Sequence, residues 1–270
     1  MDLGLKGRSC VVTGASRGIG RETARLLCAE GANVLLVGRN EDRLAAAREE
    51  AATVGAEVGG RAEVLALDVT DEGAGARMVA RANEHFGDLD VLVNNAGSAR
   101  WRRLDDVPDE DWYAQYELNV MAPLRAMRAA APPMAERGWG RIVNVCSTAG
   151  KRPSAAMPEY SVAKAAELSL SRLFADRYAK QGVLVNAICP GPVEAEMWME
   201  PGGLLDQSHQ MSGAESREEA LAEAGARRPI GRLAEVGEIA AAIVFLCSER
   251  ASYVSGAAWS VDGGTVQVII

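Results

Sequence analysis

The sequence predicts an α/β fold: a single doubly wound domain over residues 1–270, with a seven-stranded parallel sheet and helices on both faces. Three observations predict it. Short β-branched runs alternate with longer segments rich in Ala, Leu, Glu and Arg, which is the pattern of βαβ units. Most of the short runs are continuously apolar, as in strands that are buried on both faces. No Pro/Ser-rich linker divides the chain, and 270 residues fit one large domain.

The seven β-branched runs are predicted as strands, and they are separated by enough residues for the crossovers that parallel neighbours need. In chain order the predicted strands are Cys10–Thr13, Asn33–Val37, Val64–Leu67, Val91–Asn94, Ile142–Cys146, Val183–Ile188 and Ala257–Val261.

The segments between the strands have the composition of helices. Three glycines stand where a helix should end before the next strand, namely Gly31, Gly87 and Gly182. Glycine suits this position because it readily adopts the left-handed conformation that ends many helices. Four of the predicted helices are Ile19–Glu30, Asp42–Val54, Glu72–Phe86 and Glu159–Lys180.

The segment Glu194–Arg228 interrupts this alternation after the sixth predicted strand. It contains the sequence Pro-Gly-Gly at residues 201–203 and a helical stretch, Ser216–Ala224. Long insertions at the carboxyl end of a strand in such a sheet often cover a ligand. We therefore predict a mobile substrate lid at about residues 194–228; a surface insertion without function is the alternative.

Composition and charge exclude several classes of partner. The chain has 29 Lys and Arg against 37 Asp and Glu, a formal net charge of −8, which argues against nucleic acid. The longest apolar run, Ile239–Cys247, is too short to cross a membrane, and the N-terminus does not read as a signal peptide. We expect a cytoplasmic protein without a nucleic-acid or membrane partner.

Metal and disulfide chemistry are not indicated either. Histidine occurs only as His85 and His209, and no cluster has the spacing of metal ligands. The five cysteines are scattered and form no C-x-x-C pair, so we expect small buried apolar side chains.

A glycine-rich turn follows the first predicted strand, where residues 13–20 read Thr-Gly-Ala-Ser-Arg-Gly-Ile-Gly. Its glycines allow a tight turn and close approach of a ligand, and the following helix offers unpaired N–H groups to a pyrophosphate. The turn opens the first βαβ unit, which favours dinucleotide binding. Its spacing is G-x-x-x-G-x-G rather than the more general G-x-G-x-x-G.

With this turn and four further motifs, the sequence resembles the short-chain dehydrogenase/reductase family over essentially the whole chain, notably the 3-oxoacyl-reductase-like and carbonyl reductase members. All of the motifs occur in the order and spacing of the family. The resemblance implies a Rossmann-type NAD(P)-binding domain and reversible hydride transfer between nicotinamide and a ketone or secondary alcohol. The further motifs are Asn-Asn-Ala-Gly at residues 94–97, Asn119, Ser147 with Tyr-Ser-Val-Ala-Lys at residues 160–164, and Pro190-Gly191.

Tyr160 and Lys164 are four residues apart in a predicted helix, so they share one face. A free phenol has a pKa of about 10, and a nearby ammonium lowers it by stabilising the phenolate. The resemblance implies that Tyr160 donates the proton when a carbonyl is reduced and accepts it when an alcohol is oxidised. It also implies that Lys164 hydrogen-bonds the nicotinamide ribose.

Two further residues complete the catalytic set that the resemblance implies. Ser147 would donate a hydrogen bond to the substrate oxygen, although a serine that only ends a strand is the alternative. Asn119 would hold a water that links Lys164 to solvent, and a helix distorted near Pro123 is the alternative.

Gly38 and Arg39 directly follow the second predicted strand, Asn33–Val37, where NAD-selective relatives carry an acidic residue for the adenosine ribose. Arg39 and Arg17 would attract a 2′-phosphate, so we expect NADP(H), with NAD(H) as the alternative. Many relatives also have threonine where this chain has Ala195, which leaves nicotinamide contacts to the Val193 backbone. The expected cofactor-binding residues are Gly14, Ser16, Arg17, Gly18, Ile19, Gly20, Arg39, Asp68, Val69, Asn95, Ala96, Gly97, Tyr160, Lys164, Pro190, Gly191 and Val193.

Apolar residues in the first half of the lid, with Trp101 and Met157, predict a small-molecule substrate of apolar character. We also expect a homotetramer, because the tail Val266–Ile270 is almost wholly apolar and would pack on a neighbour; burial in its own subunit is the alternative. A non-catalytic dinucleotide-binding scaffold or sensor on the same fold is the alternative function. The apolar lid residues are Met197, Trp198, Met199, Leu204, Leu205 and Met211; the arginines predicted at the rim are Arg100, Arg102, Arg103 and Arg152.

Overall fold

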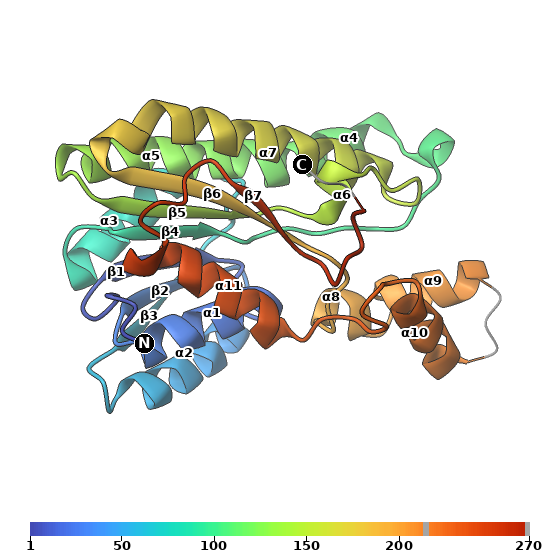
Figure 1. The fold of residues 1–270 in the computed structure, drawn as a ribbon, viewed down its shortest axis with the longest axis horizontal. Coiled ribbons are helices and arrows are strands. Elements are labelled where there is room, and N and C mark those ends of the chain that lie inside the picture. The colour runs from blue at the N-terminus through green and yellow to red at the C-terminus, as the bar shows by residue number, and fades with distance from the viewer. Residues whose placement is uncertain (213–215, 268–270) are drawn as a thin grey trace.

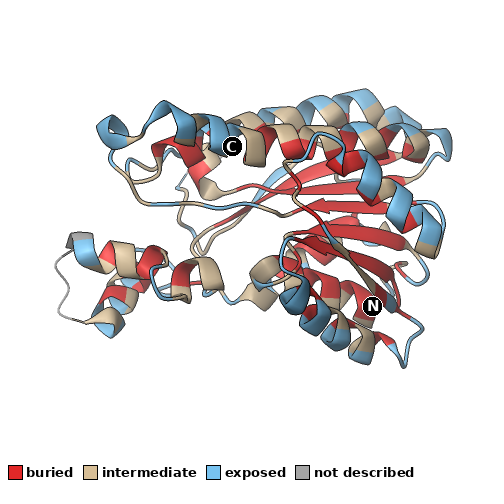
Figure 2. Ribbon diagram, turned by 180° about the vertical axis from the view of Figure 1, so that it is seen from behind, coloured by how far each residue is buried: buried red, intermediate tan, exposed pale blue. Residues whose placement is uncertain are grey.

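The computed structural model describes residues 1–212 and 216–267, and within them it contains a seven-stranded parallel sheet (Figure 1). The strand order is β3-β2-β1-β4-β5-β6-β7, so the order reverses between β1 and β4. All seven predicted strands form, and the four central ones are buried along their whole length (Figure 2). The strands are β1 (Ser9–Thr13), β2 (Asn33–Gly38), β3 (Arg61–Ala66), β4 (Val91–Asn94), β5 (Gly140–Val145), β6 (Val183–Pro190) and β7 (Ala258–Val261).

Helices cover both faces of this sheet, which confirms the doubly wound α/β class. Helices α1, α2 and α11 pack on one face, and α3, α5 and α7 pack on the other. The positive φ expected of glycine at three helix ends is present: φ is +81° at Gly31, +82° at Gly87 and +81° at Gly182. The helices are α1 (Gly18–Ala29), α2 (Glu41–Gly55), α3 (Ala74–Phe86), α4 (Asp109–Tyr116), α5 (Ala122–Glu136), α6 (Thr148–Lys151), α7 (Pro158–Tyr178), α8 (Glu196–Met199), α9 (Leu204–Ser212), α10 (Arg217–Ala226) and α11 (Val236–Cys247).

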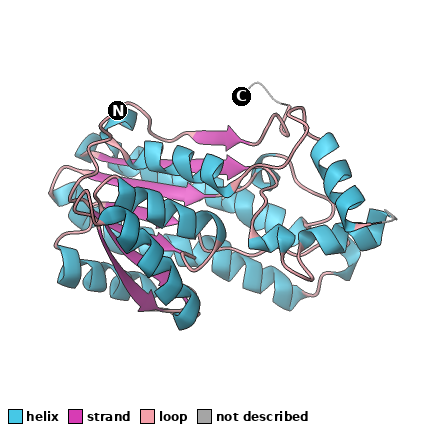
Figure 3. Ribbon diagram, turned by 90° about the horizontal axis from the view of Figure 1, so that it is seen from below, coloured by secondary structure: helices cyan, strands magenta, loops and turns pink. Residues whose placement is uncertain are grey.

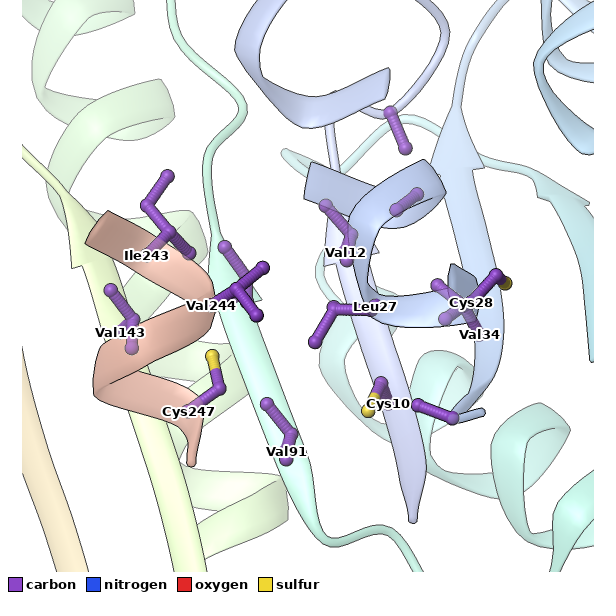
Figure 4. Packing of buried hydrophobic residues seen from close by; sticks show 14 of the residues in the cluster. Cys10, Val12, Leu27, Cys28, Val34, Val91, Val143, Ile243, Val244 and Cys247 are labelled. Atoms are coloured by element: carbon purple, nitrogen blue, oxygen red, sulfur yellow. The ribbon is translucent and has the colours of Figure 1, made fainter. Parts of the chain in front are cut away.

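Each face of the sheet has its own apolar core. Figure 4 shows the first core, where Leu27 of α1 and Ile243 of α11 lie over strand residues such as Val12 and Val143. All five cysteines are buried and unbridged, and Cys10 packs in this core beside Leu27, as a small apolar side chain would. None of the helices in the described part of the chain is long and apolar enough to span a membrane.

Helix α5 contains Pro132 and Pro133, each of which removes a backbone N–H donor from its interior. Its packing explains why it forms. Met127, Ala130 and Met134 are completely buried in the second core, against the face of the sheet that also carries α3. Tertiary contacts therefore outweigh the low helix propensity of the two prolines.

Candidate active site

A cleft of about 800 Å³ lies at the carboxyl ends of the strands, where the strand order reverses. Figure 3 shows the strands running toward the end of the molecule that carries α8, α9 and α10. The cleft extends from the glycine-rich turn to the helices of the predicted lid. Every predicted site residue lines it except Gly20 and Asn119, which lie directly behind its wall.

The glycine-rich turn is packed too tightly for side chains. Gly14 and Gly18 have φ of +64° and +55°, and a Cβ on Gly20 would lie 2.4 Å from the side-chain nitrogen of Asn95. That Asn95 nitrogen donates to the Thr13 carbonyl at 2.9 Å, which holds the turn against β4. The α1 N-terminus carries neither a side-chain cap nor an acidic residue in its first turn. Its open N–H groups therefore fit a pyrophosphate.

Arg17 and Arg39 line the end of the cleft that would hold the adenosine, and Arg43 is joined to Arg17 through Glu200. Arg17 Nη1 lies 2.5 Å from a carboxylate oxygen of Glu200, and Arg43 Nη2 lies 3.3 Å from the other. Arg39 is 80% exposed and lies 3.7 Å from Asp68. Arg43 and Glu200 were not predicted, because helix α2 and the lid bring them to this end only in the folded chain.

Asp68 is held by its own turn. It accepts hydrogen bonds from the Thr70 backbone N–H at 3.0 Å and from the Thr70 hydroxyl at 2.7 Å. Burial acts to raise the pKa of Asp68, but these hydrogen bonds and the Arg39 guanidinium outweigh it and lower the pKa. Asp68 is therefore ionised at neutral pH and lines the cleft beside Val69.

At the other end, the inner face of α7 presents Tyr160 and Lys164 together. The Lys164 ammonium lies 5.7 Å from the centre of the Tyr160 ring, and Tyr160, Lys164 and Ser147 all line the cleft. Ser147 caps the short helix α6 by accepting a hydrogen bond from the Ala149 N–H at 3.1 Å. The three side chains that the sequence places on two separate segments therefore meet at one point.

The pKa of Tyr160 differs from the sequence-based expectation. Burial raises it above its ordinary value, while the Lys164 ammonium and the Ser147 hydrogen bond act to lower it. Glu167 raises it again, so the overall direction is upward. The expectation that Lys164 lowers the pKa is correct for that pair, but it omits burial and a second charge.

Lys164 is buried and has two partners that hold its ammonium. Its Nζ donates to the Val145 carbonyl at 2.9 Å and to Glu167 Oε2 at 2.7 Å. Burial acts to lower the pKa of Lys164, but Glu167 and Tyr160 outweigh it and raise the pKa. Glu167 was not predicted; its spacing of three residues from Lys164 on one helix was the available signal.

Asn119 lies in a π-helical turn, Glu117–Met121, and is fully buried. Its side-chain nitrogen donates to Gln115 Oε1 at 2.7 Å, while its buried Oδ1 has no hydrogen-bond partner among the residues that the structure describes. A Cβ on Gly97 would lie 3.2 Å from this Oδ1 and 3.8 Å from Lys164 Nζ. The helix is therefore distorted before Pro123, and the distortion leaves an unpaired acceptor close to Lys164 that suits a water.

A third apolar cluster forms the substrate side of the cleft. Trp101 and Trp198 meet edge to face, with ring centres 6.5 Å apart and planes at 89°. Leu204 and Met157 join them, so the predicted lid packs on the loops that the sequence assigned to the same wall. The Met211 side chain lies outside the described residues.

The arginines at this end differ from those predicted. Arg152 lines the cleft, but Arg100 and the ion-paired Arg102 and Arg103 do not. Arg228 lines it instead: its Nη1 lies 2.6 Å from the Ala224 carbonyl, and its buried Nε has no hydrogen-bond partner within residues 1–212 and 216–267. Burial, and secondarily its neighbour Arg227, lowers the pKa of Arg228. No carboxylate of the described residues pairs with Arg228.

The residues present fit a nicotinamide dinucleotide, given the glycine cradle, the open helix N-terminus and the unpaired Asn119 oxygen. Among the described residues, no group of three or more His, Cys, Asp or Glu side chains could hold a metal ion.

Comparisons with known proteins agree with this geometry. The family model described as enoyl-(acyl carrier protein) reductase matches residues 14–266. D-beta-hydroxybutyrate dehydrogenase of Cupriavidus necator is 34% identical, over 97% of this chain and 99% of that protein. Cis-4-hydroxycyclohexanecarboxylate dehydrogenase of Sinomonas cyclohexanicum is 38% identical, over 97% of each chain. The crystal structure of L-sorbose reductase from Gluconobacter frateurii, complexed with NADPH and L-sorbose, superposes with a TM-score of 0.91 at 34% identity, over 100% of both chains. The chain therefore belongs to the short-chain dehydrogenase/reductase family of oxidoreductases.

Proposed function

We propose that this protein is an NADP(H)-dependent oxidoreductase that interconverts a ketone and a secondary alcohol, with Tyr160 as the acid and base. One observation carries the proposal: Tyr160, Ser147 and Lys164 meet at one end of a cleft whose other end is lined by arginines. A scaffold that only bound a dinucleotide would have no need of a tyrosine, a serine and a buried lysine at the same point.

The preference for NADP(H) over NAD(H) rests on the charges at the adenosine end. Gly38 ends β2 without the carboxylate that would accept hydrogen bonds from a ribose. Arg17 and Arg39 line the same end of the cleft, with Arg43 paired to the same Glu200 as Arg17, and guanidinium groups bind phosphate well. The similarity to an enzyme solved with NADPH supports the same choice.

In the proposed reaction the bound nicotinamide supplies or accepts the hydride. The Tyr160 hydroxyl donates its proton to the carbonyl oxygen during reduction and takes it back during oxidation. Ser147 donates a second hydrogen bond to the same oxygen, which stabilises the charge that develops there. Lys164 and the Asn119 oxygen hold the water that returns a proton to Tyr160.

The substrate that the cleft favours is apolar and carries a carboxylate. Trp101, Trp198 and Leu204 form an apolar wall, and Arg228 offers a half-buried guanidinium without a carboxylate partner among the described residues. An acid group would pair with that guanidinium. Two of the relatives are named for hydroxy acids, one of them cyclic. A ring-containing ketone with a carboxylate combines both features.

The test measures NADPH consumption with cyclohexanone and with 4-oxocyclohexanecarboxylate. We expect turnover of both, with a higher kcat/KM for the acid, and loss of that preference in Arg228→Gln.

Tyr160→Phe should lower kcat by about 10²-fold or more, because general acid catalysis contributes that much. It should leave the NADPH Kd nearly unchanged, since only a hydroxyl is removed. More than a tenth of the kcat retained in Tyr160→Phe would contradict the proposed role.

We also propose a homotetramer. Tyr113 of α4 and Val162 and Leu173 of α7 are large apolar side chains that are 54–74% exposed. Trp259 of the edge strand β7 is 43% exposed, and Tyr253, in the loop before that strand, is fully exposed. Exposed apolar side chains on different elements suit two kinds of contact between copies, as a tetramer requires. The end of the predicted tail contact, residues 268–270, lies outside the described residues.

A further inference from the structure

Glu167 is a buried carboxylate that the proposed reaction does not use. Its side chain is 1% exposed, and that of Lys164 is 2% exposed. The two residues lie three apart on α7, with Glu167 Oε2 2.7 Å from Lys164 Nζ. Buried charges are rarely tolerated without a partner, so the two side chains form a hydrogen-bonded ion pair with no net charge.

The pair also limits what Lys164 can do. An ammonium has three N–H donors, and two of them are committed to the Val145 carbonyl and to Glu167. One donor remains for a ribose hydroxyl or for the water beside Asn119. The carboxylate therefore holds Nζ at a fixed place between β5 and the Tyr160 ring.

The other titratable groups around Tyr160 are uncharged or lie farther out. Burial raises the pKa of the Cys146 thiol well above its ordinary value and that of Cys189 to about 11, so neither is ionised at neutral pH. Lys151 and Asp262 act on Cys189 with opposite sign. The groups facing the site are Tyr160, Lys164 and Glu167 of α7, Cys146 after β5, Cys189 of β6, and beyond it Lys151 of α6 and Asp262 after β7.

We propose that Glu167 is a positioning residue: it anchors the Lys164 ammonium and offsets its charge, so that Tyr160 stays protonated at neutral pH and is ready to donate to a carbonyl oxygen. An unpaired ammonium stabilises the phenolate, whereas an ammonium beside a carboxylate does so much less. The effect is large in a buried site because water does not screen it. The inference rests on the proposed role of Tyr160, and it favours reduction up to a higher pH than an unpaired lysine would.

The first test titrates Tyr160 directly, by tyrosinate absorbance of the cofactor-free protein. The chain has 5 tyrosines, so each protein is compared with its own Tyr160→Phe version to isolate one hydroxyl. In Glu167→Gln the amide oxygen still accepts from Lys164, but the negative charge is gone. We expect the midpoint of Tyr160 to fall by about one pH unit.

A matched control is available on the same helix. Glu159 is also buried, at 2% exposure, but it is not among the groups that shift the pKa of Tyr160. Glu159→Gln should therefore leave the Tyr160 midpoint in place. Glu167→Leu is a second test variant that fills a similar volume without a polar group, should Glu167→Gln fold poorly.

The second test follows the pH profile of turnover. Reduction needs protonated Tyr160, so Glu167→Gln should lose its kcat/KM for ketone at a pH about one unit lower than the unmodified protein. Oxidation of the alcohol should become effective at a correspondingly lower pH.

The outcomes separate the two proposals. A shifted tyrosinate midpoint without any turnover of ketone or alcohol would sustain the role of Glu167 and refute the proposed function. Turnover with an unchanged midpoint in a folded Glu167→Gln or Glu167→Leu would refute the role of Glu167. An upward shift would also refute it, because Lys164 would then lose its proton when the carboxylate is removed.

Discussion

The proposed preference for NADP(H) depends most on two residues, Gly38 and Arg39. Any carboxylate at the end of β2 would repel a 2′-phosphate, and Gly38 has no side chain at all. Arg39 is exposed and only loosely paired with Asp68 at 3.7 Å, so it is available to a phosphate at little cost. The charge of this one residue should therefore matter more for NADPH than for NADH.

Arg39→Asp should weaken the preference for NADPH over NADH or invert it, because it replaces an attractive charge by a repulsive one. The measurement is kcat/KM for both cofactors with one ketone. Arg128→Asp is the control, since Arg128 is exposed on α5 and does not line the cleft. Equal kcat/KM for the two cofactors in the unmodified protein would show that the arginines do not select the phosphate.

At the scale of elements, the proposed lid, residues 194–228, contacts both ends of the cleft. Glu200 follows α8 and pairs with Arg17 and Arg43 at the adenosine end, while Trp198 packs on Trp101 at the substrate end. Surface ion pairs of this kind contribute little to stability, about 0–1 kcal/mol each. A 2′-phosphate that binds the same arginines would compete with Glu200, so cofactor and lid should influence each other.

The lid proposal predicts a change in hydrogen exchange. When NADP⁺ and a substrate analogue are added together, the backbone amides of residues 194–228 should exchange more slowly, because a closed lid opens less often. Amides of α3, which packs against α5 and β1 and has no residue in the cleft, serve as the reference. If a bound analogue left exchange in residues 194–228 unchanged, the segment would be a fixed wall instead of a lid.

For the whole molecule, the exposed apolar surfaces on α7 and on β7 point to an assembly. Val162 and Leu173 are about three helical turns apart, so both exposed side chains lie on one face of α7. Leaving this apolar face in water costs free energy that contact with another copy would recover. Static light scattering at micromolar concentration should therefore give about four times 28.6 kDa. Replacing Leu173 by Glu should dissociate the assembly into smaller units. A mass near 28.6 kDa for the unmodified protein would exclude the tetramer.

The sequence by itself was sufficient to predict the α/β architecture and those site residues that lie close together in the chain. Continuous apolar runs locate the seven strands, because burial on both faces demands them. The glycine turn of residues 13–20 and the spacing of Tyr160 and Lys164 can be read directly, since a turn and one helical repeat are short-range features.

Packing accounts for the features that the sequence left undetermined. Helix α5 forms in spite of Pro132 and Pro133 because its methionines fill the core. Glu200 meets Arg17 across 183 positions of sequence, and no local pattern encodes such a pair. Glu167 is three residues from Lys164, yet its effect on Tyr160 depends on the exclusion of water from both side chains. Burial of that kind is a property of the folded chain, because it is produced by every element that packs around the site.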